Sequence, residues 1–270
     1  MEFFGGLNRF MYQACGYFWY LLTARHRWGY GLHSPFMYDF CRQVLWRSNR
    51  EALFRVRSRV RALKKDTRMV ACPDDPGAGS AVLSSDGEPV GRIVGRSSVS
   101  YKYGKVLYAA ARVFNPSTIL ELGASVGIST MYLCEGAPQA DVYTIEACRE
   151  KLAVCRENAR LLGHDHLHPV QGSFAKVVPG LLRGISSPDI VFIDGDHRKD
   201  KVLEYFEQIV PHLQHDSLVI FDDIHWSKEM TRAWEILTTH PGVKVSVDLF
   251  RVGILLFRRE LSPQRFKIAY

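Results

Sequence analysis

The sequence of 270 residues predicts an α/β protein whose mostly parallel sheet is covered by helices on both faces. From Ser117 onward, short apolar runs alternate with longer helix-like runs, which is the pattern of repeated βαβ units. After the last helical run, residues 244–250 and 251–257 form two β-rich runs with almost no connection, which indicates an antiparallel hairpin at one edge of the sheet. The first hundred residues lack this alternation. We therefore expect a basic, helical N-terminal extension over residues 1–100 and an α/β domain over residues 101–270.

The elements follow from the apolar runs and the residues that end them. Five strands are expected, at Thr118–Gly123, Asp141–Glu146, Leu167–Gln171, Asp189–Asp194 and Leu218–Asp222. Five helices are expected between and after them, near Gly127–Cys134, Arg149–Leu162, Ala175–Leu182, Lys201–Leu213 and Lys228–Thr239. In the extension, an aromatic helix-like run comes first, a basic helix-like segment follows from about Tyr38 to Lys65, and a turn-rich stretch runs from Cys72 to Gly95.

Charge is distributed unevenly along a chain whose formal net charge is +7. Residues 1–117 contain 18 basic and 8 acidic side chains, whereas residues 118–270 contain 17 and 20. Ten Lys or Arg residues against two acids lie between Arg42 and Arg68. This run is typical of a solvated helix face or of a surface for anionic lipid. Nucleic acid is disfavoured because no DNA- or RNA-binding module and no interleaved aromatic residues accompany the run.

The uncharged aromatic segment Phe10–Leu22 is too short for a membrane span, which needs about 18 to 20 apolar residues. Peripheral contact with a membrane, packing over the mouth of a site, and a homodimer contact all explain it. The six cysteines form no C-x-x-C pair, so we expect reduced, buried thiols and a cytoplasmic protein, with the inner membrane face as the place of any peripheral contact.

A strand, a turn of small residues and a helix start lie together at residues 119–130. The turn Gly123-Ala124-Ser125-Val126-Gly127 allows a ligand to approach the backbone closely, and the following helix offers unpaired N–H groups. A dinucleotide fingerprint needs G-x-G-x-x-G, whereas these glycines are four residues apart and Glu121 precedes them. The spacing therefore disfavours NAD and FAD.

Acidic residues end three of the expected strands. Glu146 ends the second strand, where a carboxylate accepts both hydroxyls of a ribose. Asp194 follows the fourth strand, and Asp222 and Asp223 follow the fifth, so these three meet at the carboxyl edge of the sheet. Three carboxylates packed together are unfavourable unless a cation neutralises them. The sequence therefore predicts a divalent metal, with Mg²⁺ as the first choice.

The run Glu121-Leu122-Gly123-x-x-x-Gly127-x-Ser129 resembles the first motif of class I S-adenosylmethionine-dependent methyltransferases, in the form typical of catechol and caffeoyl-CoA O-methyltransferases. The resemblance covers residues 118–258 and implies a Rossmann-like, seven-stranded sheet. It places Glu121, Gly123, Ala124, Ser125, Gly127 and Ser129 around the methionine part of the cofactor, and Gly172, Ser173 and Phe174 near the adenine, with Asp194 also at the cofactor. The same resemblance makes Asp194, Asp222 and Asp223 the metal ligands.

Three residues are candidates for the group that accepts a proton. Asp194-Gly195-Asp196 followed later by Asp222-Asp223 resembles sugar O-methyltransferases of the macrocin type, which implies Asp196 as the base. His197 lies near the position of a catalytic lysine in the catechol type, and a neutral imidazole accepts protons near pH 7. His225 follows the acid pair closely. For His197 or His225 taken alone, a surface or hydrogen-bonded structural role is favoured over catalysis. The sequence leaves Asp196 and His197 open.

The resemblance implies methyl transfer from S-adenosylmethionine to a hydroxyl oxygen of a small molecule. A vicinal diol or catechol is the geometric expectation, because two adjacent oxygens chelate a metal well. Phenols, sugars and lipid headgroups remain open as acceptors. Two alternatives remain: an NAD(P)-dependent oxidoreductase, and a non-catalytic adapter that binds a membrane or a partner. His33-Ser34-Pro35-Phe36 and Gly77-Ala78-Gly79-Ser80 resemble a bacterial methyltransferase group with a helical N-terminal extension, in which the second motif has no assigned role.

Overall fold

The protein is described here from a computed structural model that covers residues 2–26, 29–47, 53–72, 87–97 and 99–270. Its helices are α1 (Glu2–Thr23), α2 (Pro35–Phe40), the π-helical η2 (Cys41–Trp46), α3 (Phe54–Leu63), α4 (Val90–Ser97), α5 (Tyr101–Phe114), α6 (Ile128–Gly136), α7 (Arg149–Leu162), α8 (Phe174–Gly184), α9 (Lys199–Ile209), the 3₁₀ turn η3 (Val210–His212) and α10 (Lys228–Leu237). Its strands are β1 (Met69–Val70), β2 (Glu88–Pro89), β3 (Thr118–Leu122), β4 (Asp141–Glu146), β5 (Leu167–Gln171), β6 (Ile190–Ile193), β7 (Leu218–Phe221), β8 (Val245–Asp248), β9 (Gly253–Leu256) and β10 (Gln264–Lys267).

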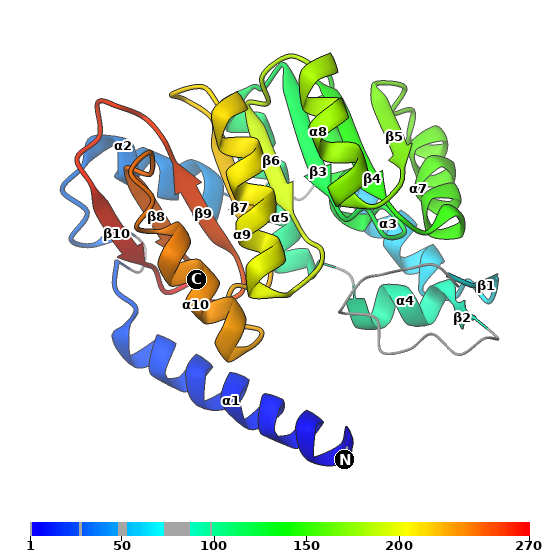
Figure 1. The fold of residues 1–270 in the computed structure, drawn as a ribbon, viewed down its shortest axis with the longest axis horizontal. Coiled ribbons are helices and arrows are strands. Elements are labelled where there is room, and N and C mark those ends of the chain that lie inside the picture. Colours follow the sequence, from blue (N-terminus) through cyan, green and yellow to red (C-terminus); the bar gives the residue numbers. More distant parts are fainter. Residues whose placement is uncertain (1, 27–28, 48–52, 73–86, 98) are drawn as a thin grey trace.

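The central sheet confirms the predicted mostly parallel α/β fold. Its strand order is β10-β8-β9-β7-β6-β3-β4-β5, and only β9 runs antiparallel to its neighbours (Figure 1). The five predicted strands and five predicted helices are all present, each within a few residues of its expected bounds. The predicted hairpin is β8-β9. It does not lie at the edge, because β10 pairs in parallel with β8 and extends the seven expected strands to eight.

Both faces of the sheet are buried, which is why its strands read as continuous apolar runs. Alternate residues of β6 point to opposite sides: Ile190 and Phe192 join a core with α5, α6 and α7, whereas Val191 and Ile193 join a core with α8, α9 and α10. Figure 1 shows α8, α9 and α10 in front of the sheet and α5 behind it. This double layer holds the carboxyl ends of the parallel strands in fixed register.

The extension shares the core of the α/β domain. Buried residues of α2, η2, α3 and α4 belong to the same apolar cluster as α5 and α6. The predicted basic helical segment from Tyr38 to Lys65 is interrupted, since η2 ends at Trp46 and Arg47 is extended. The predicted turn-rich stretch contains β2 and the start of α4, while Gly77-Ala78-Gly79-Ser80 lies outside the described residues.

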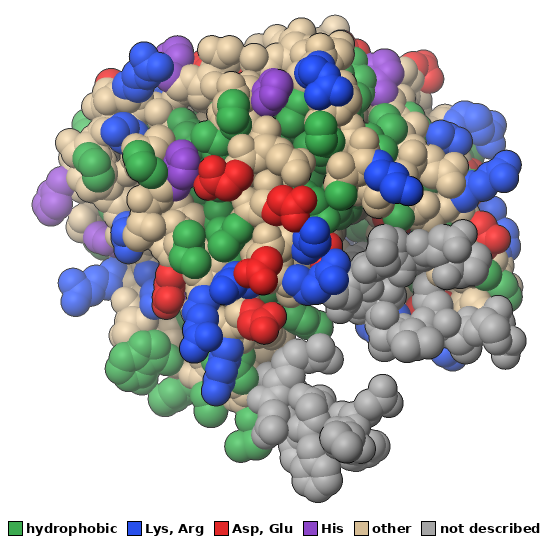
Figure 2. All heavy atoms as spheres, viewed as in Figure 1, with side chains coloured by type: hydrophobic (Ala, Val, Ile, Leu, Met, Phe, Trp, Pro, Cys, Tyr) green, Lys and Arg blue, Asp and Glu red, His purple; other side chains and the backbone are tan. Residues whose placement is uncertain are grey.

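Helix α1 packs with one side against the carboxyl edge of the sheet. Gln13 Nε2 donates to the carbonyl of Trp226 at 3.1 Å, and the ring of Tyr17 lies 4.9 Å from that of Phe250. Its other side exposes large apolar residues: Met11, Phe18, Trp19, Leu21 and Leu22. Figure 2 shows hydrophobic side chains along this rim of the molecule. Among the described residues no helix is long and apolar enough to cross a membrane, and the membrane and dimer contacts stay predictions.

The expectation of reduced, buried cysteines is wrong for one pair. Cys72 and Cys148 form a disulfide that joins the end of the extension's β1 segment to the N-terminus of α7. Sequence spacing could not reveal it, because 76 positions separate the two residues. Three other cysteines (Cys41, Cys134 and Cys155) are buried thiols as expected, whereas Cys15 is exposed.

Candidate active site

The turn after β3 needs glycine at two positions for steric reasons. Gly123 has φ +103°, and a Cβ there would lie 2.0 Å from the carbonyl oxygen of Asp194. Gly127 has φ +84°, and a Cβ there would lie 2.7 Å from Cys155 Sγ. Left-handed backbone conformations favour glycine, and neither position has room for a side chain. Ala124 and Ser129, the other small residues predicted here, are buried in the turn and in the first turn of α6.

Glu146 is fixed at the end of β4 by the backbone around it. Its Oε2 accepts a hydrogen bond from the Ser125 N–H at 2.8 Å, and its Oε1 accepts one from the Cys148 N–H at 2.9 Å. The side chain therefore couples the glycine turn to the second strand of the domain. Each carboxylate oxygen has two lone pairs, and the carboxyl end of a parallel strand is where a carboxylate accepts hydroxyl groups of a ligand.

Glu121 lies beneath the turn rather than at its surface. It is fully buried, and its Oε2 accepts hydrogen bonds from the hydroxyls of Thr130 and Thr144 at 2.5 and 2.6 Å. Burial raises the pKa of this carboxyl group above its usual range, although the hydroxyl donors oppose that shift. Its contacts link β3, β4 and α6, so its contribution to the site is to support the turn.

The loop after β5 reaches the end of β6. Gly172 has φ +149°, and Ser173 immediately precedes α8. The ring of Phe174 packs at 5.4 Å against Tyr205 and covers Gly195, where a Cβ would lie 2.5 Å from the ring. Phe174 is thus brought beside the Asp194-Gly195-Asp196 loop, and Gly172 and Ser173 directly precede it in the chain.

The three aspartates predicted as metal ligands converge at the ends of β6 and β7. Burial, and then the charges of Asp222 and Asp223, raise the pKa of Asp194 well above its usual range. Burial and the charge of Asp222 raise the pKa of Asp223 to about 7, while the Arg251 guanidinium opposes the rise. Repulsion between carboxylates is therefore present here, as the sequence indicated.

The cation at these carboxylates is a guanidinium. Arg251 donates from Nε and Nη2 to the two oxygens of Asp222 at 3.2 Å each, and its Nε lies 3.1 Å from Asp223 Oδ1. The described residues contain no group of three His, Cys, Asp or Glu side chains arranged to hold a metal ion. The donor set does not fit the predicted Mg²⁺, because Arg251 already pairs with both oxygens of Asp222 and with one oxygen of Asp223, and its charge repels a second cation at that place. The sequence reasoning missed this arginine.

Two of the three candidate bases are occupied by other side chains. Asp196 accepts from Arg198 Nε at 2.5 Å and Nη2 at 2.8 Å, and its Oδ2 also accepts from the Tyr205 hydroxyl at 3.2 Å. The ring nitrogens of His225 lie 3.1 Å from Thr231 Oγ1 and 2.9 Å from Asp248 Oδ2. Their roles as bases stay predictions.

His197 is the candidate base that faces the acid cluster. Its Nε2 lies 3.8 Å from Asp223 Oδ2, and its ring centre is 6.1 Å from that of Trp226. Burial lowers the pKa of the imidazole below its usual value, so the neutral form prevails at pH 7. A neutral imidazole next to a carboxylate is suited to accept a proton.

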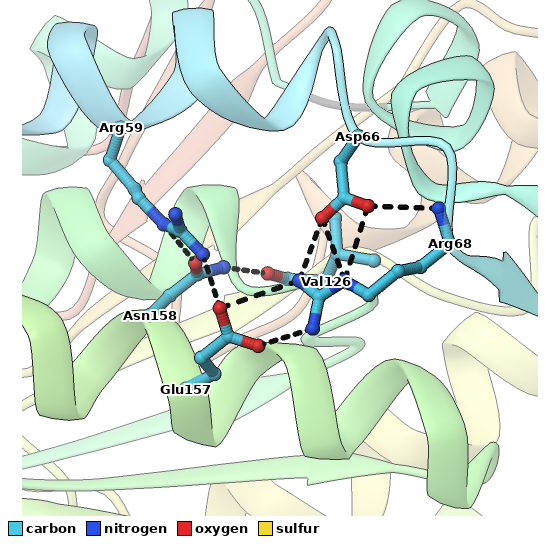
Figure 3. A network of polar contacts seen from close by, with 6 residues as sticks. All are labelled: Arg59, Asp66, Arg68, Val126, Glu157 and Asn158. Carbon is cyan, nitrogen blue, oxygen red and sulfur yellow. Dashed lines mark hydrogen bonds and ion pairs between the residues drawn. The ribbon is translucent and has the colours of Figure 1, made fainter.

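A chain of polar contacts connects the extension to the glycine turn (Figure 3). Arg59 Nε donates to Asn158 Oδ1 at 2.6 Å, and Asn158 Nδ2 donates to the carbonyl of Val126 at 2.7 Å. Glu157 on α7 pairs with Arg59 at 2.9 Å and with Arg68 at 2.6 Å. These arginines belong to the basic run of the extension. Part of that run thus holds the extension onto the domain, a role that the sequence reasoning did not weigh.

A pocket of about 300 Å³ lies at the opposite edge of the sheet, before the starts of β3, β6 and β7. Phe36 and Phe40 of α2 line it together with Arg258. Ser34 caps α2 by accepting from the Met37 N–H at 3.3 Å. The His33-Ser34-Pro35-Phe36 motif therefore builds this distant pocket and does not reach the acid cluster.

Residues 120–224 match a sequence family described as a methyltransferase domain. Over 153 residues the chain is 31% identical to a catechol O-methyltransferase of Mycobacterium tuberculosis, a stretch that covers 56% of this chain and 66% of that protein. A second catechol O-methyltransferase, from Niastella koreensis, is 28% identical over 47% of this chain and 58% of its own length. The chain therefore contains a methyltransferase domain. The match spans less than two thirds of either relative.

Solved structures of O-methyltransferases share the fold of this chain. An O-methyltransferase from Bacillus cereus, in complex with S-adenosylhomocysteine (SAH), superposes with a TM-score of 0.53 at 18% identity, over 81% of this methyltransferase and 96% of that chain. The O-methyltransferase TomG from Streptomyces achromogenes, in complex with S-adenosylmethionine, gives 0.53 at 23% identity, over 60% and 82%. At such identities the likeness shows the fold alone. The NAD(P) alternative is not favoured by these matches.

Proposed function

We propose that this methyltransferase transfers the methyl group of S-adenosylmethionine to a hydroxyl oxygen of a small acceptor molecule. The observation that carries the proposal is the coupling of the glycine turn to Glu146 through the Ser125 N–H, directly beside the cluster that contains His197. The turn permits close approach of the methionine part of the cofactor, and Glu146 would accept the ribose hydroxyls. Two relatives that support the proposal are both named catechol O-methyltransferase.

The chemistry supplied by bound S-adenosylmethionine is an electrophilic methyl group on a sulfonium. His197 accepts the proton of the acceptor hydroxyl, the oxygen forms the new bond to the methyl carbon, and the sulfur keeps the electron pair of the bond that breaks. The products are a methyl ether, SAH and protonated His197. Asp223, 3.8 Å from Nε2, stabilises the imidazolium that forms. Magnesium does not enter this proposal, since Arg251 pairs with Asp222 and Asp223.

Cofactor binding tests the first half of the proposal. Calorimetric titration of the full chain should show one SAH site and no NAD site. Glu146→Gln should weaken SAH binding about 10- to 100-fold, because a charged acceptor of two hydroxyls is lost. Asp141→Asn, an exposed acid at the opposite end of the same strand, is the matched control and should bind normally. Binding of NAD in place of SAH would refute the proposal.

Methyl transfer tests the second half. The protein is incubated with methyl-labelled cofactor and a metabolite extract. The labelled products are then separated, and the bond that holds the labelled methyl group is identified as an ether, an ester, or a bond to nitrogen or carbon. Label in an ether of a small hydroxylated compound is the expected result. Label confined to nitrogen, carbon or carboxyl ester positions would contradict transfer to a hydroxyl oxygen.

A further inference from the structure

The acid cluster contains a cation that belongs to the chain itself. Asp222 is almost fully buried, with a side chain only 1% exposed, and both of its oxygens accept from Arg251. The same guanidinium reaches Asp223, whose side chain is 15% exposed. A buried carboxylate pair needs a positive partner, and here one side chain serves both acids.

The backbone fixes Arg251 at this place. Because β9 is antiparallel, its first residue pairs with the last residue of β7, so the residues before β9 arrive at the carboxyl edge of the sheet. The carbonyl of Arg251 accepts from the Ile224 N–H at 3.0 Å, and its own N–H donates to the carbonyl of Leu249 at 3.0 Å. Phe250, with φ +71°, makes the tight turn between β8 and β9. Both backbone polar groups of Arg251, its N–H and its carbonyl, are thus fixed by hydrogen bonds.

A divalent ion and this guanidinium compete for the same oxygens. Mg²⁺ must approach carboxylate oxygens to about 2.0–2.1 Å, and the guanidinium of Arg251 already lies against both oxygens of Asp222 and against Asp223 Oδ1. A metal in that position would also meet the like charge of the guanidinium in a poorly solvated site. Only one of the two cations fits at the pair.

We propose that Arg251 is the resident cation of this active site and stands where a divalent metal would otherwise neutralise Asp194, Asp222 and Asp223. The inference rests on the proposed function for its catalytic meaning. It also changes the expected acceptor. A metal favours a vicinal diol because two adjacent oxygens chelate it, whereas a site neutralised by Arg251 has no such requirement, and an acceptor with a single hydroxyl meets its needs.

Metal binding by the full chain tests the proposal without any acceptor. Mn²⁺ alone is titrated into the protein and followed by electron paramagnetic resonance of the free ion. The wild-type protein should bind no Mn²⁺ at this cluster. Arg251→Met removes the cation and keeps much of the side-chain volume. It should create one Mn²⁺ site whose affinity is at least about tenfold higher than that of any Mn²⁺ binding by the wild-type protein. Adding Asp223→Asn to Arg251→Met should abolish that site.

The control is Arg258→Met, because Arg258 has similar side-chain exposure, 33% against 31%, and packs over Phe36 far from the acids. It should bind no more Mn²⁺ than the wild type. A wild-type site that Asp223→Asn abolishes would overturn the proposal, and so would a folded Arg251→Met protein that gains no site. If Arg251→Met does not fold, the wild-type and Asp223→Asn titrations decide alone.

An activity measurement separates this inference from the proposed function. With a labelled acceptor in hand, methyl transfer by the wild type should be unchanged, within about twofold, by a chelator or by added Mg²⁺. Loss of transfer in chelator would overturn the role of Arg251 and leave O-methyl transfer intact. Absence of any transfer to hydroxyl oxygen would refute the proposed function, while the Mn²⁺ titration would still report on Arg251.

Discussion

Replacement of Asn158 by alanine tests whether the extension holds the glycine turn in place. Asn158 is fully buried and lies between Arg59 and the carbonyl of Val126 (Figure 3). The change removes one charge-assisted hydrogen bond of 2.6 Å and one neutral bond of 2.7 Å. A charged bond contributes about 1.5–3 kcal/mol and a neutral one about 1 kcal/mol, so the free energy of unfolding should fall by about 2–4 kcal/mol.

The assay is urea denaturation of the wild type and the variant, combined with SAH titration under native conditions. SAH affinity should fall together with stability, because the carbonyl that loses its donor belongs to the glycine turn. Arg42→Ala is the control: this exposed arginine pairs only weakly, at 3.5 Å, with Asp39, so its removal should change stability by less than about 1 kcal/mol. A loss below about 1 kcal/mol for Asn158→Ala, or unchanged SAH affinity, would refute the coupling.

Three further changes probe other parts of the molecule. Gly123→Ala should cost at least about 1–3 kcal/mol and abolish SAH binding, because its Cβ would lie 2.0 Å from the Asp194 carbonyl at φ +103°; normal denaturation and binding would contradict this. His197→Gln should lower kcat about 10²- to 10⁴-fold. In the wild type, kcat should rise with pH up to the lowered pKa of His197 and stay level above it, since only the unprotonated ring accepts a proton; a flat profile across this range argues against His197. Cys72→Ser should lower the free energy of unfolding by as much as about 4 kcal/mol, because the bond to Cys148 closes a long loop, and a reductant should have no effect on the variant. An unchanged denaturation midpoint would show that the bond adds no stability.

Local patterns predicted most of the α/β domain. Alternation of apolar runs and helix-like runs placed each strand, since a strand buried on both faces must be apolar along its whole length. The rule that ligands bind at the carboxyl ends of parallel strands then placed Glu146, Asp194 and Asp222 on one edge without any coordinates. The sequence also predicted the strand-to-helix turn, from two glycines between an apolar run and a helix-like run. The structure shows why glycine is needed there: a positive φ and a close contact both exclude side chains.

Interactions between distant residues were decided only by the tertiary structure. Arg251 reaches the acid pair because β9 is antiparallel to β7. The spacing between Arg251 and the aspartates along the chain does not by itself predict this contact. A usable signal did exist: a basic residue just before an antiparallel strand that neighbours the acid-bearing strand. The contact of His197 with Asp223, across 26 positions of the chain, likewise depends on the neighbouring places of β6 and β7 in the sheet.

The amino-acid sequence by itself determined the layer architecture, the glycine turn and the gathering of acids at one edge, because each follows from short-range periodicity or from strand direction. Only the tertiary structure showed which cation lies beside those acids and which groups the arginines of the basic extension contact. Charge counts give the sum of the charges and not their partners. Arg59 and Arg68, which belong to the run that suggested an anionic lipid surface, pair with Glu157 on the domain. Two of the three acids that suggested Mg²⁺, Asp222 and Asp223, pair with Arg251.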